Sequence, residues 1–107
     1  MSAEVALLAE EFALLRSVAD DGGLCALAFD EALRPLFEPL LEEKLLVVRS
    51  DALCLTEMGR QFLLLTAGVR HGEPVAIARV RLQTAYLRAV ESTARLYEGL
   101  PTRTSRR

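Results

Sequence analysis

The hydrophobic positions at the start of the chain follow the spacing of a helix. Apolar residues recur every three or four positions between Ala3 and Ala19. Ser2 is a residue type that caps helices, and Glu4 would lie near the positive end of the helix dipole. The pattern therefore predicts a helix from Ala3 to Ala19, ended by the glycines of the segment 20–23.

This predicted helix carries two apolar stripes, although a surface helix needs only one. The first stripe is Val5, Leu8, Phe12, Leu15 and Ala19, and the second is Leu7, Leu14 and Val18. We expect the first to face the core and the second to face another molecule. The alternative is that both stripes complete an intramolecular core.

The segment from residue 24 to residue 44 contains two prolines. The apolar run 24–29 predicts a short strand that leads into a helix, and Asp30 and Glu31 start or continue that helix. Pro35 and Pro39 follow, and proline is tolerated in the first turn of a helix but breaks or kinks its interior. The helix that ends near Lys44 is therefore expected to be short.

Leu45–Arg49 and Ala52–Leu55 have the alternation of two hairpin strands. Ser50-Asp51 between them is not the favoured Asn-Gly pair, so a turn longer than two residues stays open. One face is apolar and is expected on the core, whereas the other is mixed. The apolar face comprises Leu46, Val48, Leu53 and Leu55, and the mixed face comprises Val47, Arg49, Ala52 and Cys54.

The residues after the hairpin carry the signals of a new helix. Thr56 is an N-cap residue type, and Glu57 complements the helix dipole. Gly59 predicts a close approach to the hairpin or the first helix, because glycine otherwise weakens a helix interior. Pro74 then opens a long last helix to about Tyr97.

Together these elements predict one mainly α domain with a small β-hairpin over residues 1–98. Their order is that of a winged helix (a helix-turn-helix plus a wing) with flanking N- and C-terminal helices. The polar, basic segment 99–107 is expected to be a disordered tail.

Composition changes this picture in two ways. A hydrophobic fraction of 51% and a mean hydropathy of +0.23 are high for a soluble chain of 107 residues. We therefore expect some apolar surface to lie in an interface. A net charge of −2 argues against a domain whose main task is to grip nucleic acid.

The chemistry-bearing residues do not form a catalytic pattern. Cys25 and Cys54 stand in apolar surroundings and are expected to be reduced, buried thiols. The single histidine, His71, lies in a polar loop and is expected to be exposed. Without a basic leader or an apolar run of about 18 residues, we expect a cytoplasmic protein without membrane contact.

The stretch LLEEKLLVVRSDALCLTEMGRQFL resembles the C-terminal winged-helix domain of the oxygen-independent coproporphyrinogen III oxidases and their radical-SAM relatives. The matching residues are Leu45, Leu46, Val47, Leu55, Thr56, Gly59, Arg60 and Phe62. The resemblance covers about Phe29–Leu65. Where that family continues with Arg-Asn, this chain has Leu64 and Leu65. Other winged-helix regulators share the Leu-Thr-x-x-Gly ending.

The resemblance implies an accessory domain without catalytic residues, metal or cofactor. The iron–sulfur cluster of that family needs three closely spaced cysteines in a preceding barrel, and this chain has two distant ones. We therefore expect a non-enzymatic binding module.

We expect this module to be a homodimer joined through its terminal helices. The candidate interface residues are Leu7, Leu14, Val18, Val80, Leu87, Val90 and Tyr97. The alternative is a small DNA-binding transcriptional regulator with contacts from Arg34, Lys44 and Arg49. Against it, Glu38, Glu42 and Glu43 on the candidate reading helix would repel phosphate.

Overall fold

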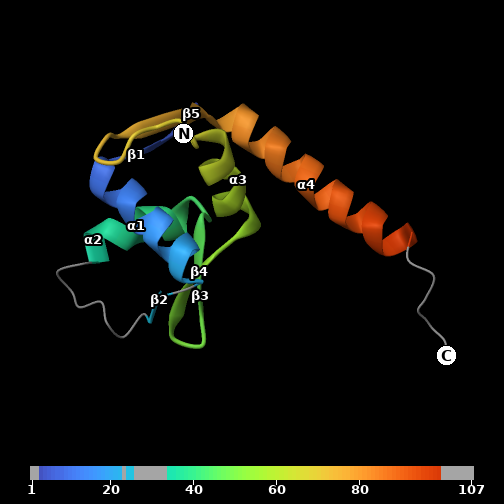
Figure 1. Ribbon diagram of the computed structural model, residues 1–107, viewed down its shortest axis with the longest axis horizontal. Coiled ribbons are helices and arrows are strands. Elements are labelled where there is room, and N and C mark those ends of the chain that lie inside the picture. Colours follow the sequence, from blue (N-terminus) through green and yellow to red (C-terminus); the bar gives the residue numbers. More distant parts are fainter. Residues whose placement is uncertain (1–2, 23, 26–33, 100–107) are drawn as a thin grey trace.

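The computed structural model describes residues 3–22, 24–25 and 34–99, with side-chain burial for residues 3–22 and 34–94. The described residues form four helices and two small antiparallel sheets (Figure 1). In chain order the elements are β1 (Glu4–Leu7), α1 (Ala9–Asp21), β2 (Leu24–Cys25), α2 (Arg34–Glu42), β3 (Leu46–Arg49), β4 (Ala52–Leu55), α3 (Glu57–Leu65), β5 (Val75–Ala78) and α4 (Arg79–Gly99). The strand orders are β1-β5 and β2-β4-β3.

The first residues form a strand, so the predicted helix from Ala3 is wrong in its first turn. Val5 and Leu7 are buried while their neighbours in β1 are exposed, which is the period of a strand. Helix α1 begins only at Ala9, where the Glu11 carboxylate accepts a hydrogen bond of 2.9 Å from the Leu8 amide. This carboxylate, rather than Ser2, caps the helix that the structure describes.

The segment after Pro74 is also a strand, which corrects the predicted start of the last helix. β5 pairs with β1 in the register Val5↔Ile77 and Leu7↔Val75. The side chains of these four residues are buried, whereas the opposite face of the ribbon is exposed. Neither strand could be recognised locally, because each takes its hydrogen bonds from the other end of the chain.

The predicted hairpin is confirmed, with a turn of two residues. Arg49 pairs with Ala52, and Ser50 and Asp51 have φ angles of 49° and 65°. A two-residue turn of this kind needs a left-handed backbone at both positions, and Asp tolerates that region better than most residues. β2 adds a third strand by pairing with β4.

The inner face of the hairpin agrees with the predicted face near the body and departs from it near the turn. Leu46 and Leu53 are buried and Leu55 is half-buried, but Val48 is 49% exposed. Val48 stands close to the turn, where the hairpin extends past the helices (Figure 1).

Helix α2 contains both prolines and is short, as predicted. Pro35 lies in its first turn and Pro39 in its interior, where it removes one helical hydrogen bond. The helix ends in a Schellman motif: the Lys44 amide donates to the Leu41 carbonyl (3.0 Å) and the Leu45 amide to the Leu40 carbonyl (2.9 Å). Lys44 has a φ of 64° in this motif.

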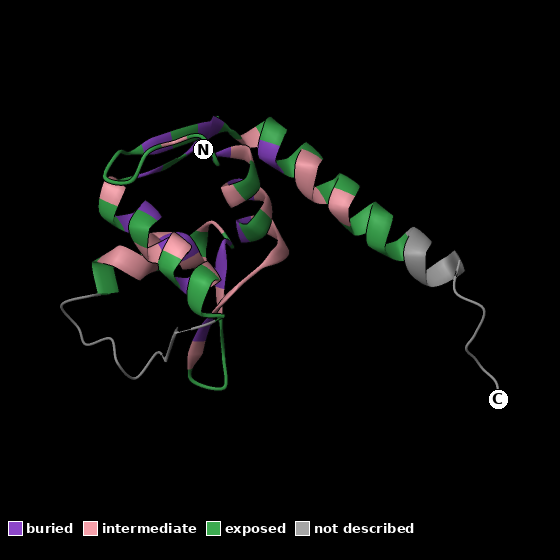
Figure 2. Ribbon diagram, in the orientation of Figure 1, coloured by how far each residue is buried: buried purple, intermediate pink, exposed green. Residues whose placement is uncertain are grey.

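One core holds the helices and both sheets together (Figure 2). The Phe12 and Phe62 rings meet edge to face, with their centroids 6.2 Å apart. Leu7 and Val18 belong to this core, with exposed fractions of 2% and 0%. The expectation that these two residues face a partner is therefore wrong, because β5 pairs beside Leu7 while α1 packs on α2 and β4. Leu14 is half-buried against the same core.

The hairpin and α3 approach each other closely at their junction. Thr56 caps α3: its Oγ1 accepts a hydrogen bond of 2.9 Å from the Gly59 amide and lies 2.6 Å from the Lys44 carbonyl oxygen, to which it donates. A Cβ atom on Gly59 would stand 2.8 Å from Leu55 Cδ1 and closer still to the Leu45 carbonyl oxygen. The predicted close approach at Gly59 is confirmed.

A bidentate ion pair joins the start of α4 to the end of α2. The two terminal nitrogens of Arg79 lie 2.7 and 3.1 Å from the carboxylate oxygens of Glu43. The Arg79 amide also donates to the Ala3 carbonyl (2.8 Å). The hydrogen bond from Arg79, aided by its charge and opposed by partial burial, lowers the pKa of Glu43.

Replacing Gly59 by alanine is expected to destabilise the protein by about 3 kcal/mol, because the Leu45 backbone cannot move aside cheaply. Urea unfolding measures the loss. Gly68→Ala is the matched control, since a Cβ there meets nothing within 4 Å. Equal stability of the two variants would contradict the close approach.

Replacing Glu43 by glutamine is expected to lower the free energy of unfolding by about 1 kcal/mol near neutral pH. A carboxyl group whose pKa is lowered by folding stabilises the native state above its unfolded pKa of about 4.3. That stabilisation is lost as the pH falls through the lower, folded pKa.

The difference between wild type and Glu43→Gln should therefore disappear at acid pH, as followed by urea unfolding at stepped pH. Glu42→Gln, at the exposed neighbouring position, is the control and should show little difference at any pH. A Glu43→Gln difference that does not change with pH would contradict the ion pair.

Candidate binding surfaces

Helix α4 has two apolar sides, and the described part of the chain covers one of them. Leu82 is 2% exposed, and Ala85, Tyr86 and Ala89 are half-buried on the side that packs towards α3. The other side bears Val80, Leu87 and Val90, with exposed fractions of 69%, 62% and 43%. These three residues lie where an interface was expected, whereas the side chain of Tyr97 lies outside the described part.

The exposed side of α4 follows a coiled-coil spacing. We call it the α4 seam and define it by Val80, Gln83, Leu87, Val90 and Ala94, all of which are exposed. The intervals alternate between three and four residues, as at the a and d positions of a heptad repeat. In the sequence, Tyr97 continues the same spacing.

The second half of α4 extends away from the body of the domain (Figure 1). Residues 91–94 are all exposed. Figure 2 shows this stretch in green, as the last part of α4 before the grey end. A helix in a globular protein is stabilised chiefly by packing of an apolar face. Residues 91–94 have no such buried face within the described chain.

The outer face of the β1–β5 ribbon is a second apolar surface. Ala6, Ala76 and Ala78 are exposed there, and Leu8 beside them is 61% exposed. A recess of about 320 Å³ is lined by Ala6, Leu7, Leu8, Pro74, Val75 and Ala76. Sequence reasoning missed this surface because it treated both segments as helix.

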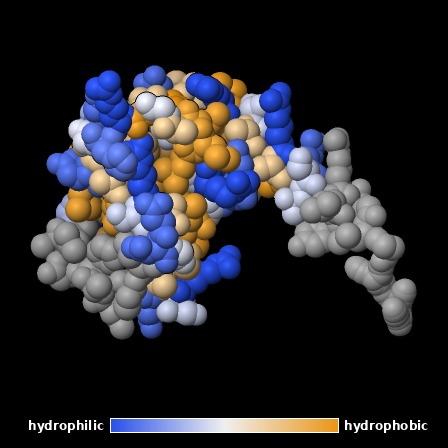
Figure 3. All heavy atoms as spheres, in the orientation of Figure 1, coloured by the Kyte–Doolittle hydropathy of each residue, from blue (hydrophilic) through white to orange (hydrophobic). Residues whose placement is uncertain are grey.

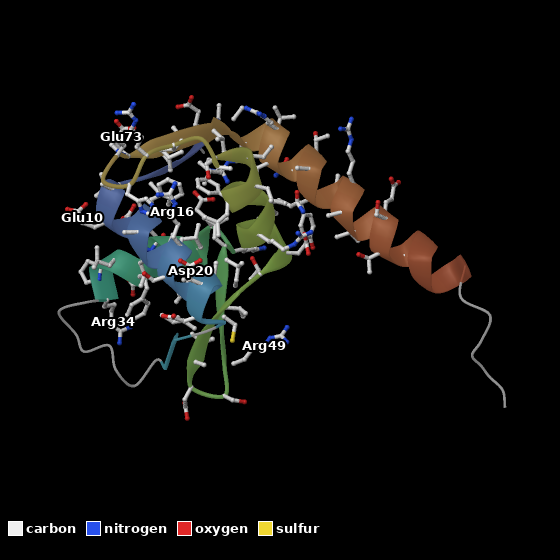
Figure 4. The ribbon with its side chains drawn as sticks, in the orientation of Figure 1. Glu10, Arg16, Asp20, Arg34, Arg49 and Glu73 are labelled. Atoms are coloured by element: carbon white, nitrogen blue, oxygen red, sulfur yellow. The ribbon has the colours of Figure 1, made fainter. Side chains whose placement is uncertain are left out.

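A polar recess of about 400 Å³ lies between α1 and the loop after α3. Arg16, Asp20 and His71 contribute to its lining. The Arg16 guanidinium lies 4.0 Å from the centre of the Phe12 ring and donates a 2.6 Å hydrogen bond to the Val69 carbonyl. Arg16 therefore holds the loop against α1, and Figure 4 shows it on the same helix as Asp20. His71 is exposed, as expected.

The three cations proposed for DNA contact come from separate places. Arg34 begins α2, where it lies 3.7 Å from Glu38, and Arg49 ends β3 (Figure 4). Lys44 follows the other end of α2, and the helix is about 12 Å long from Arg34 to Glu42 at 1.5 Å per residue. It lines a recess of about 360 Å³ with Thr56 and Tyr86. The three cations therefore lie on different elements of the described chain.

The residues that carry the family resemblance lie in the core, in the hairpin and in the first two turns of α3. Leu46 and Phe62 are in the core, and Val47 and Leu55 are half-buried in the hairpin. Thr56 and Gly59 form the junction described above. Arg60 is exposed and lies 2.8 Å from Glu57, one turn earlier on α3, and its hydrogen bonds lower the pKa of Glu57.

Other candidate chemistry is sparse in the described part. Cys54 is a half-buried free thiol whose Sγ lies 3.9 Å from the Ala52 carbonyl oxygen, and the Cys25 side chain lies outside the description. Over the described residues, no three His, Cys, Asp or Glu side chains are grouped so that they could hold a metal ion. None of the described helices combines the length and apolar character needed to cross a bilayer.

Comparison with protein-family models, with curated proteins and with solved structures yielded no match for this chain. The surfaces of the domain itself therefore carry the functional argument. In the space-filling view, hydrophobic side chains gather over the body of the domain and hydrophilic ones surround them (Figure 3).

Proposed function

We propose that this chain is a non-catalytic winged-helix binding module that works as a homodimer through the α4 seam. The observation that carries the proposal is the exposed heptad face of α4, on a helix whose opposite face is packed against α3. The proposal includes kinship with the accessory domain of the coproporphyrinogen oxidase family, which rests on the stretch from Leu45 to Phe62.

The strand order supports the winged-helix part of the proposal. A winged helix places a short strand after its first helix and a hairpin after its reading helix. Here β2 follows α1, the hairpin β3–β4 follows α2, and β4 pairs with both β2 and β3. The helix expected to start or continue at Asp30 and Glu31 lies outside the described residues.

The dimer part is supported by the energetics of exposed apolar side chains. Burying one Val or Leu side chain stabilises an association by about 1.5–3 kcal/mol before the entropic cost of association is subtracted. A two-fold dimer buries the same seam residues in both copies, so each residue contributes two side chains. Val80, Leu87 and Val90 of both copies therefore offset part of that cost.

Replacing Leu87 by glutamate is expected to weaken the dimer by about 100-fold or more, because a charge enters the seam from both copies. Sedimentation or light scattering at stepped concentration gives the dissociation constant. The monomer should keep its fold, since Leu87 is 62% exposed.

Leu64→Glu is the matched control for this experiment. Leu64 is 58% exposed and lies on α3 rather than on the seam, so its replacement should leave the dissociation constant unchanged. A wild-type protein that is monomeric at tens of micromolar would overturn the homodimer.

A DNA-binding regulator is the second candidate, and the exposed Arg49 at the end of the wing strand is the observation that favours it. Against it, α2 carries Glu38 and Glu42 on exposed positions, which repel phosphate.

We expect the protein to bind duplex DNA weakly and without preference between a specific and a random sequence. Gel shifts at two salt concentrations measure both properties. Arg49→Ala is the matched variant and should change any binding uniformly across sequences. Salt-sensitive binding that is much tighter to one site would make the regulator the better reading.

A further inference from the structure

Within the homodimer proposed above, on which this inference rests, we infer that the two α4 helices pair antiparallel. The two-fold axis passes between Arg88 and Ala89, so that Gln83 of one copy lies opposite the partner's Ala94. The occupant of the α4 seam is thus a second copy of this chain, held in one register.

The sizes of the seam residues favour this direction. In antiparallel helices an a position faces a d position of the other helix, so Leu87 faces the partner's Val90 and the long Gln83 faces the small Ala94 of the partner subunit. A parallel pair would instead place Gln83 against its own copy and Ala94 against its own copy. One layer would then hold two long side chains, and another would leave a gap between two methyl groups.

The shape of the domain favours the same direction. The end of α4 extends from the body, whereas its beginning packs beside α3 (Figure 1). Antiparallel pairing lays the extended end of each helix along the supported beginning of the other copy's helix. Parallel pairing would leave the two extended ends in contact only with each other.

The helix dipoles favour antiparallel pairing as well. Two α4 helices that run in opposite directions set the positive end of each dipole beside the negative end of the other.

Disulfide trapping of the full chain tests the direction. Two variants are made, Gln83→Cys and Ala94→Cys, both at exposed positions that tolerate a small side chain. Each is oxidised alone and in an equimolar mixture, and the linked peptides are identified by mass spectrometry, so that Cys25 and Cys54 can remain in place. A disulfide needs Cα atoms about 4.4–6.8 Å apart, whereas residues 83 and 94 of one helix are about 16 Å apart.

The antiparallel pair predicts a link between positions 83 and 94 in the mixture and no link in either variant alone. Links in each variant alone, with none between 83 and 94, would show a parallel pair and overturn the inference while the homodimer stands. No link in any sample, although light scattering still shows dimers, would place the interface elsewhere and also overturn it.

Light scattering on each reduced variant is run in parallel. Monomers in these samples and in the wild type would mean that the proposed homodimer itself has failed, and the inference with it. Circular dichroism verifies that both variants keep the helical content of the wild type.

Discussion

The fold depends on the contact between Gly59 and the Leu45 carbonyl. There the end of α2, the start of the hairpin and the first turn of α3 come within van der Waals distance of one another. Thr56 secures the contact from both sides, because its hydroxyl receives the Gly59 amide and donates to the Lys44 carbonyl. The left-handed Lys44 at the end of α2 and the buried Phe62 on α3 lie on either side of this contact. α3 in turn packs on α4, so the position of the α4 seam is set at this junction.

Local signals were enough to predict this central part from the sequence. The alternation in the hairpin, the capping threonine and the mid-helix glycine each describe interactions with near neighbours in the chain. The ribbon β1–β5 was missed for the opposite reason. Val5 and Leu7 fit a helical spacing as well as a strand spacing, and only pairing with Val75 and Ile77 decides between them. The burial of Leu7 follows from that pairing.

The candidate surface was predicted in part. Val80, Leu87 and Val90 were recognised from their helical spacing, and they are exposed as an interface requires. The sequence does not show which side of α4 packs on α3. It therefore could not show that Leu82 is buried while these three residues are exposed. The outer face of the β1–β5 ribbon could not be predicted, because its two strands are about 70 residues apart in the sequence.

The pairing of Glu4 with Ala78 has a consequence for the synthesis of the protein. On the ribosome, β1 emerges long before the strand that will complete it, and its backbone edge stays without its native partner until nearly the whole domain has been made. Non-local pairing of this kind is slow, and an open strand edge can recruit another chain. Helix α4 begins directly after β5, so its first turn is fixed only once β5 has paired with β1. An incomplete chain therefore does not yet present the α4 seam.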